Sequence, residues 1–211
     1  MRGKIMKKFK HVSIAVFLVL AVFAAGCFGG GGDDSERYAR GVITESGFES
    51  EFLNLRFALP AGFHMLSEEE IQDMVEFAEE VILDNDGRPD ILQALTVYEM
   101  MAMAPIGAPN VSVIVERLIL RTSLENYIES FKAEILSELG DAVEISDENV
   151  NVEFAGETYR VVTATLHMFG MEMHQMYLFR QIDNRVVSII ATYTDDTAEE
   201  KQAMMDAFSP F

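Results

Sequence analysis

Three two-residue turn signals divide the C-terminal half of the chain, and they constrain its fold more than any other feature. They are Ala155-Gly156, Phe169-Gly170 and Asp183-Asn184. Loops this short join neighbouring antiparallel strands. The stretches that flank them are rich in β-branched, aromatic and alternating apolar residues, as strands are, and run near 150–154, 159–168, 171–180 and 185–194. The sequence therefore predicts an antiparallel meander of four strands.

Helical signals precede and follow this meander. Three Ser/Thr-x-x-Glu pairs have the spacing of a capping box: Ser67 with Glu70, Thr122 with Glu125, and Thr197 with Glu200. Apolar residues recur at helical spacing after each pair, and Gly140 stands where a C-terminal cap of the second helix would lie. We expect two longer helices after Ser67 and Thr122, and a short last helix that ends near Phe208.

The remaining apolar segments predict further strands, at 48–52, 55–59, 95–103 and 111–118. Met100, Met101 and Met103 fall in the third of these segments, where we expect them to pack in the core. No repeat and no proline- or serine-rich linker interrupts the chain after Gly41. The sequence predicts a single α+β domain over 41–211, with a single antiparallel sheet flanked by helices.

The N-terminus has the pattern of a bacterial lipoprotein signal. A basic segment at 1–11 is followed by an apolar run at 12–25 that is shorter than the roughly 20 residues a spanning helix needs. Ala24-Ala25-Gly26-Cys27 resembles a lipobox, so we expect residues 1–26 to be a signal peptide and Cys27 to carry the lipid, with palmitate-type chains. Residues 27–40, rich in glycine and aspartate, would then be a flexible tether.

Charge and cysteine content narrow the function. The chain has 16 basic and 35 acidic residues, and five of the basic ones lie in 1–26 with no acid, so the part from Cys27 on carries a net charge of −24. Such a chain repels a phosphate backbone, which argues against nucleic-acid partners. Cys27 is the only cysteine, so no intramolecular disulfide can form.

The hairpin around Phe169-Gly170 carries the one constellation with metal-ligand chemistry. With a tight two-residue turn there, position 167 pairs with 172 and 165 with 174. His167, Glu172 and His174 would then share one strand face with Met176, while the apolar side chains face the core. Imidazoles and a carboxylate suit zinc, and a nearby thioether favours cuprous copper. A one-residue shift of the turn would send His167 and Glu172 to opposite faces. The alternative interpretation is a pair of surface histidines beside an acidic residue, without a metal.

Other clusters point to chemistry less strongly. Asp84-Asn85-Asp86-Gly87 echoes part of a calcium loop but lacks the spaced ligands of an EF-hand. No nucleophile elbow, P-loop, dinucleotide fingerprint or zinc-protease motif occurs, so the chain is expected not to be an enzyme. Convergent carboxylates, which sequence cannot locate, keep a hydrolase as a third alternative.

Several of these segments together resemble PsbP-like proteins, and more closely the small secreted lipoproteins of that fold from clostridia and related bacteria. The segments are Phe57-Ala58-Leu59-Pro60-Ala61-Gly62-Phe63 within 52–63, Gly156-Glu157-Thr158-Tyr159 in a hairpin, and a closing helix before Phe208-Ser209-Pro210-Phe211. Phe63 stands where tryptophan is usual. The resemblance implies an α/β/α sandwich and relatives that bind partner proteins without catalysis.

The function expected from the sequence is that of a non-enzymatic, lipid-anchored domain on the extracytoplasmic face of the cell membrane. It would bind or assist an unidentified protein or small ligand, without a cofactor. The alternative is a zinc- or copper-binding lipoprotein that uses His167, Glu172 and His174.

Overall fold

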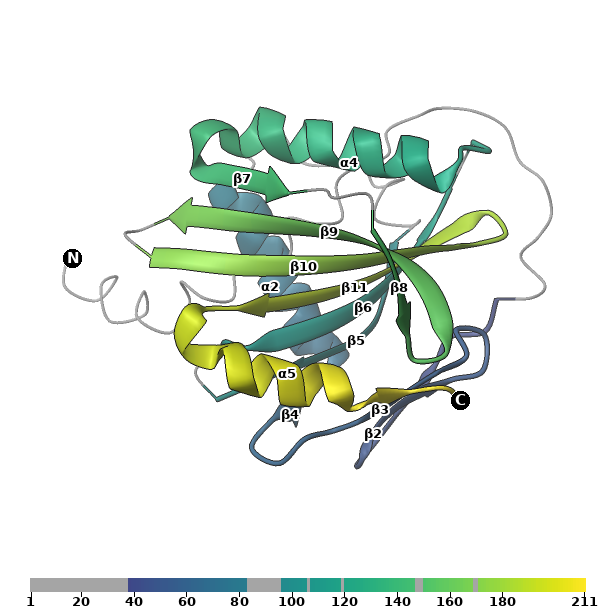
Figure 1. Cartoon of the computed structure of the whole chain (residues 1–211). Helices are drawn as coiled ribbons and strands as arrows, with labels where there is room; N and C mark the ends of the chain where they lie inside the picture. Colours follow the sequence, from purple (N-terminus) through teal and green to yellow (C-terminus); the bar gives the residue numbers. More distant parts are fainter. Residues whose placement is uncertain (1–37, 83–95, 106, 119, 147–149, 169–170) are drawn as a thin grey trace.

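The computed structural model describes residues 38–82, 96–105, 107–118, 120–146, 150–168 and 171–211 (Figure 1). The predicted signal peptide, Cys27 and most of the glycine-rich tether lie outside the described residues, as do Asp84-Asn85-Asp86-Gly87 and the turn Phe169-Gly170. The expectations for these segments therefore stay predictions.

A large antiparallel sheet forms the centre of the domain. Its strands lie in the order β4-β5-β6-β11-β10-β9-β7, and β8 also pairs with β9. The bounds are β4 His64–Met65, β5 Thr96–Met103, β6 Asn110–Arg117, β7 Val143–Ser146, β8 Asn151–Phe154, β9 Glu157–Met168, β10 Met171–Ile182 and β11 Arg185–Tyr193. The predicted meander is confirmed, since β8, β9, β10 and β11 pair in chain order.

A second, smaller sheet corrects the expectation of a single sheet. It has the order β1-β2-β3-β12, from Val42–Thr44, Gly47–Ser50, Leu55–Ala58 and Phe208–Ser209. Phe208, expected at the end of a helix, instead pairs with Phe57 of β3, and their rings lie 4.7 Å apart. The apolar side of these short strands is buried against the large sheet, and burial of these aromatic rings favours strand pairing at the C-terminus over one more helical turn.

The α-helices of the described residues pack on the large sheet and are α2 Glu68–Ile82, α4 Leu124–Leu139 and α5 Ala198–Asp206. The capping box of Ser67 and Glu70 is present, because each residue hydrogen-bonds the backbone amide of the other. The second helix is capped by Ser123 rather than Thr122, since Ser123 Oγ accepts from the Asn126 amide, and Gly140 ends it as expected. Thr197 stands at the N-cap position of α5 as predicted, but its side chain makes no capping hydrogen bond to the helix. Its hydroxyl instead accepts from the Thr194 amide in the short turn η4, Asp195–Thr197.

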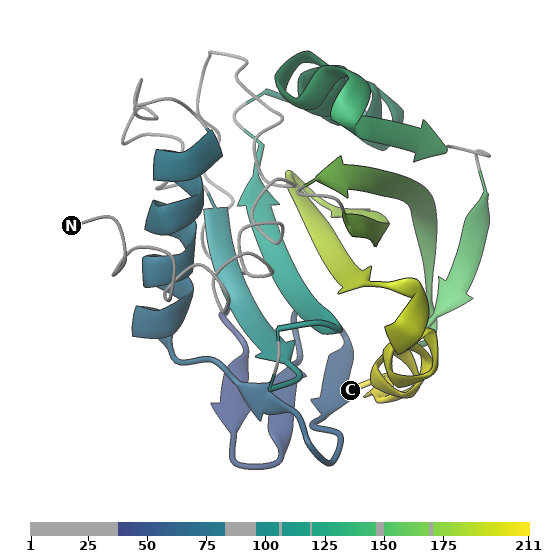
Figure 2. The same ribbon diagram turned by 90° about the vertical axis from the view of Figure 1, so that its left-hand side faces the viewer.

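The two faces of the large sheet hold separate cores. Figure 2 shows the ribbon of α4 well apart from that of α5. Alternate residues of β9, β10 and β11 pack under α4, and the residues between them pack against α5 and the small sheet. Helix α2 packs on Met101 and Met103 of β5, which are buried as predicted. Among the residues that the structure describes, no helix combines the length and apolar composition needed to cross a bilayer.

Candidate metal site

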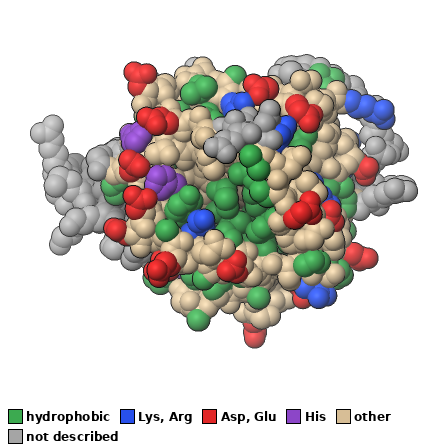
Figure 3. All heavy atoms as spheres, in the orientation of Figure 1, with side chains coloured by type: hydrophobic (Ala, Val, Ile, Leu, Met, Phe, Trp, Pro, Cys, Tyr) green, Lys and Arg blue, Asp and Glu red, His purple; other side chains and the backbone are tan. Residues whose placement is uncertain are grey.

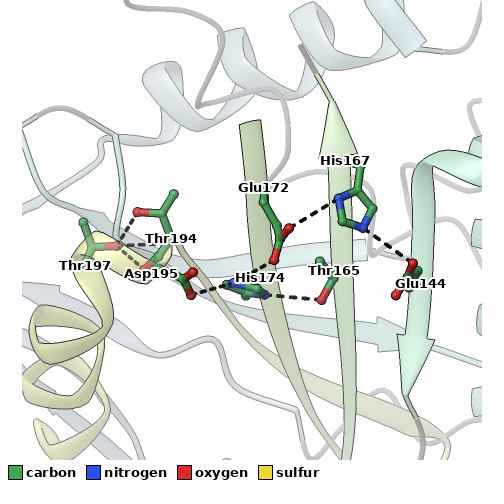
Figure 4. A network of polar contacts seen from close by, with 8 residues as sticks. All are labelled: Glu144, Thr165, His167, Glu172, His174, Thr194, Asp195 and Thr197. Atoms are coloured by element: carbon green, nitrogen blue, oxygen red, sulfur yellow. Dashed lines mark hydrogen bonds and ion pairs between the residues drawn. The ribbon is translucent and has the colours of Figure 1, made fainter. Parts of the chain in front are cut away.

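The hairpin of β9 and β10 has the register that the sequence predicts. Met168 pairs with Met171, and His167 pairs with Glu172. Residues 162, 164, 166, 173 and 177 are buried under α4. His167, Glu172 and His174 therefore lie on the opposite face, near the end of β9 and the start of β10 (Figure 4).

His174 is the centre of a polar cluster on this face. Its Nε2 lies 3.1 Å from Oδ1 of Asp195 and 3.7 Å from Oε1 of Glu172. Its Nδ1 lies 3.3 Å from Oγ1 of Thr165, the residue directly opposite on β9. The His174 side chain is only 20% exposed, and its ring centroid lies 5.3 Å from that of Tyr193. Thr165 and Tyr193 thus hold the imidazole with Nε2 toward the two carboxylates.

Asp195 is the member of the cluster that the sequence interpretation missed. It follows β11 in the turn η4, where Thr194 and Thr197 hold the backbone by reciprocal hydrogen bonds. The register of β10 with β11 pairs His174 with Tyr193. The same register, continued two residues past the end of β11, places Asp195 opposite Glu172. Counting residues outward along both strands from the Asp183-Asn184 turn would have placed Asp195 opposite Glu172 from the sequence alone.

His167 lies beside the cluster and not within it. Its Nδ1 is 3.6 Å from Oε2 of Glu172, and its Nε2 is 3.8 Å from Oε1 of Glu144 on β7. The group whose ligand atoms all lie within 4.8 Å of one another is Glu172, His174 and Asp195. The structure brings all three predicted residues onto one surface, but Asp195 takes the place expected for His167. Met176 lies on the same face and packs partly against the core.

Two carboxylates and an imidazole nitrogen that converge in this way create a locally negative site. Their ligand atoms lie within 4.8 Å of one another, and at that limit two unit negative charges repel by about 1 kcal/mol in bulk water and about 3.5 kcal/mol at an effective dielectric constant of 20. Asp195 and Glu172 are 89% and 53% exposed, so water screens part of this repulsion. Burial, with a smaller contribution from Asp195, raises the pKa of Tyr193, so its hydroxyl stays protonated next to the cluster. Figure 3 shows histidines among acidic side chains at one edge of this face.

The donor set resembles that of zinc sites with an open position. Zinc takes imidazole nitrogen and carboxylate oxygen, and sites with three protein ligands leave a further position for water or another ligand. In this arrangement His174 would bind through Nε2, since Nδ1 already contacts Thr165. The cluster has the chemistry to hold a divalent cation at the protein surface.

Known proteins resemble this chain in structure and not in sequence. No protein-family model and no curated protein matches the sequence. Among solved structures, the chain is similar to cyanobacterial PsbP (CyanoP) from Synechocystis, with a TM-score of 0.48 and 10% identity over 84% of this chain and 100% of that one. It is also similar to LpqN of Mycobacterium tuberculosis, described as involved in cell envelope biogenesis, with a TM-score of 0.45 and 12% identity over 74% of this chain and 82% of that one.

A PsbP structure is thus among the solved structures that this chain resembles, in line with the resemblance predicted from the sequence. Identities and TM-scores at this level carry over no function. The functional argument therefore depends on the residues of this chain.

Proposed function

We propose that this protein is a non-enzymatic, lipid-anchored binding domain on the extracytoplasmic face of the cell membrane, and that its ligand is a zinc ion. The ion would be held by Glu172, His174 and Asp195. The observation that carries the proposal is the position of Nε2 of His174, which faces both carboxylates while Thr165 occupies the other ring nitrogen.

A cation at this point removes the repulsion between the two carboxylates. A proton on His174 could do so in part, but it contributes one positive charge and a metal ion contributes two. Zinc fits the donors better than cuprous copper does, because cuprous copper prefers thiolate and thioether ligands and the three residues supply one nitrogen and two carboxylates. The donor set therefore favours zinc over cuprous copper as the proposed ligand.

The anchoring half of the proposal comes from the sequence. Residues 1–26 have the pattern of a signal peptide, and Cys27 follows the lipobox-like residues 24–26. Two or three acyl chains, at about 0.8 kcal/mol for each buried methylene, would hold the chain on the membrane permanently.

Metal analysis tests the binding half. The full chain is purified in mild detergent without a histidine tag or chelators, assayed for bound metal, and titrated with zinc by calorimetry. We expect one zinc per chain, loss of binding in His174→Ala, and weaker binding in Asp195→Asn. His64→Ala is the matched control, because His64 lies on β4, four strands from β10 in the sheet. No saturable binding, or binding that His174→Ala leaves unchanged, would refute the zinc site.

Mass spectrometry of the N-terminal peptide tests the anchor. We expect cleavage before Cys27 and an acylated cysteine, and we expect Cys27→Ala to release the domain from the membrane fraction. An unmodified Cys27 in membrane-bound protein would contradict the anchoring half and leave the zinc result untouched.

A further inference from the structure

The position of His167 relative to Glu172 suggests a role other than that of a ligand. His167 on β9 is the direct register partner of Glu172 on β10, and its other neighbour is Glu144 on β7. Each ring nitrogen thus faces a carboxylate on a different adjacent strand, at 3.6 Å and 3.8 Å. The imidazole lies between two acidic side chains and not against His174 (Figure 4).

The two oxygens of Glu172 are divided between the two histidines. Oε1 lies 3.7 Å from His174, on the side of Asp195, and Oε2 lies 3.6 Å from His167. A glutamate that is 53% exposed would otherwise be free to turn into solvent, and its ordering would cost rotamer entropy on metal binding. A neighbour that holds one oxygen reduces that cost, because the other oxygen is already aimed at the ion.

We propose that His167 is a positioning residue of the zinc site: with Glu144 behind it, it holds Oε2 of Glu172 so that Oε1 is presented to the ion beside His174. This inference rests on the proposed function. Carboxylates that bind a metal are commonly held by hydrogen bonds from an outer partner. The 3.6 Å separation becomes a hydrogen bond if it shortens by about 0.6 Å, which a small rotation of the glutamate provides.

Direct ligation by His167 fits the geometry less well. The nearer nitrogen, Nδ1, already faces Oε2 of Glu172, and the group that converges within 4.8 Å does not include His167. To coordinate the same ion, the ring would have to leave Glu144 and displace Glu172. Its placement therefore favours support of the carboxylate over ligation of the metal.

Histidine NMR together with zinc titration distinguishes the roles. With ¹⁵N-histidine-labelled full chain, zinc should change Nε2 of His174 to a metal-bound shift and leave both nitrogens of His167 in their metal-free pattern. His167→Ala should weaken zinc binding about 10- to 100-fold with one zinc per chain retained. His167→Gln, whose amide can still donate to Glu172, should recover part of the affinity, and Glu144→Gln should cause a smaller loss.

Each outcome separates this inference from the proposed function. A metal-bound shift on His167 would make it a ligand, and an unchanged affinity in His167→Ala would make it an ordinary surface histidine; either overturns the inference with the zinc site intact. Zinc binding that survives His174→Ala would instead remove the site itself. Thermal melts of the variants, compared with His64→Ala, confirm that any loss of affinity is not a loss of folding.

Discussion

Phe131 of α4 tests whether aromatic packing fixes this helix to strand β10 of the large sheet. Its side chain is 1% exposed, and its ring lies 5.0 Å from the rings of both Tyr177 and Phe179, at interplanar angles of 70° and 71°. These are edge-to-face contacts from a helix to one strand, β10. Since β10 also carries Glu172 and His174 on its other face, the packing of α4 supports the strand that presents the site.

The expected cost of Phe131→Ala follows from this burial. Truncating a buried phenylalanine to alanine lowers the free energy of unfolding by about 3 to 5 kcal/mol. The two ring contacts of Phe131, at about 0.5 to 1.5 kcal/mol each, put the expected loss toward the upper part of that range. For a domain of this length, each kcal/mol lowers Tm by about 2 to 4 °C. We expect a free energy of unfolding lower by about 4 kcal/mol and a Tm lower by roughly 8 to 16 °C.

Urea unfolding followed by circular dichroism measures the loss, with Leu136→Ala as the control on the same helix. Leu136 is 48% exposed, so its truncation should change the free energy of unfolding by less than about 0.5 kcal/mol. Equal losses in the two variants, or a loss below about 1 kcal/mol for Phe131→Ala, would refute the idea that α4 is held to β10 by this ring.

Two further predictions concern the small sheet and the first helix. Gly47→Ala should prevent stable folding, because φ of Gly47 is +147° and a Cβ there would lie 1.8 Å from the Phe57 carbonyl oxygen. Gly62→Ala is the control: φ of Gly62 is +85° but the space around it is open, so the substitution should cost only about 1 kcal/mol. Expression level and thermal melts compare the two variants. Two hydrogen bonds from Ser67, the larger contribution from its amide and the smaller from its hydroxyl, lower the pKa of Glu70 from its usual 4.5. The stabilisation of the folded protein by ionised Glu70 is therefore fully present above pH 4.5 and is lost as pH falls through the lowered pKa. Water screens this exposed carboxylate, so Glu70→Ala should cost only about 0.5 kcal/mol at pH 7 and nothing measurable near pH 2, and a pH-independent difference in urea melts would contradict this.

The sequence predicted the parts of the fold that depend on local signals. Two-residue turns determine the register of a hairpin by counting, and this placed His167 opposite Glu172 and both on the strand face opposite the apolar side chains. Capping residues located the starts of the helices to within one or two residues. These predictions succeeded because the residues that encode them are neighbours in the chain.

The parts that sequence interpretation missed depend on contacts between distant segments. Phe208 has helical spacing relative to Met204, yet it pairs with Phe57, about 150 residues earlier. Of the small sheet, β2 and β3 were predicted as strands, but β1 and β12, with three and two residues, are too short for alternation to identify them. Asp195 lies past the end of β11 in a short turn, so strand periodicity does not mark it, and only the register counted from the Asp183-Asn184 turn brings it beside Glu172 and His174.

The site and the entry of the tether lie at opposite ends of the large sheet. Tyr38, where the described chain begins, donates to the buried Glu99 of β5, which also accepts from the Gly41 amide at 2.8 Å. The Arg185 guanidinium lies 4.7 Å from the Tyr38 ring, at the end of β11 where Arg185 pairs with Ile182.

His174 is eight residues from Ile182 along β10, about 27 Å at the rise of an extended strand. The contact of Tyr38 with Arg185 thus places the first described residues toward the end of the sheet remote from Glu172, His174 and Asp195. An anchor at Cys27 would act on that far end, so the three ligand groups would stay accessible to ions in solution while the protein is on the membrane. Metal binding measured on the anchored chain and on the released Cys27→Ala chain should therefore give the same affinity.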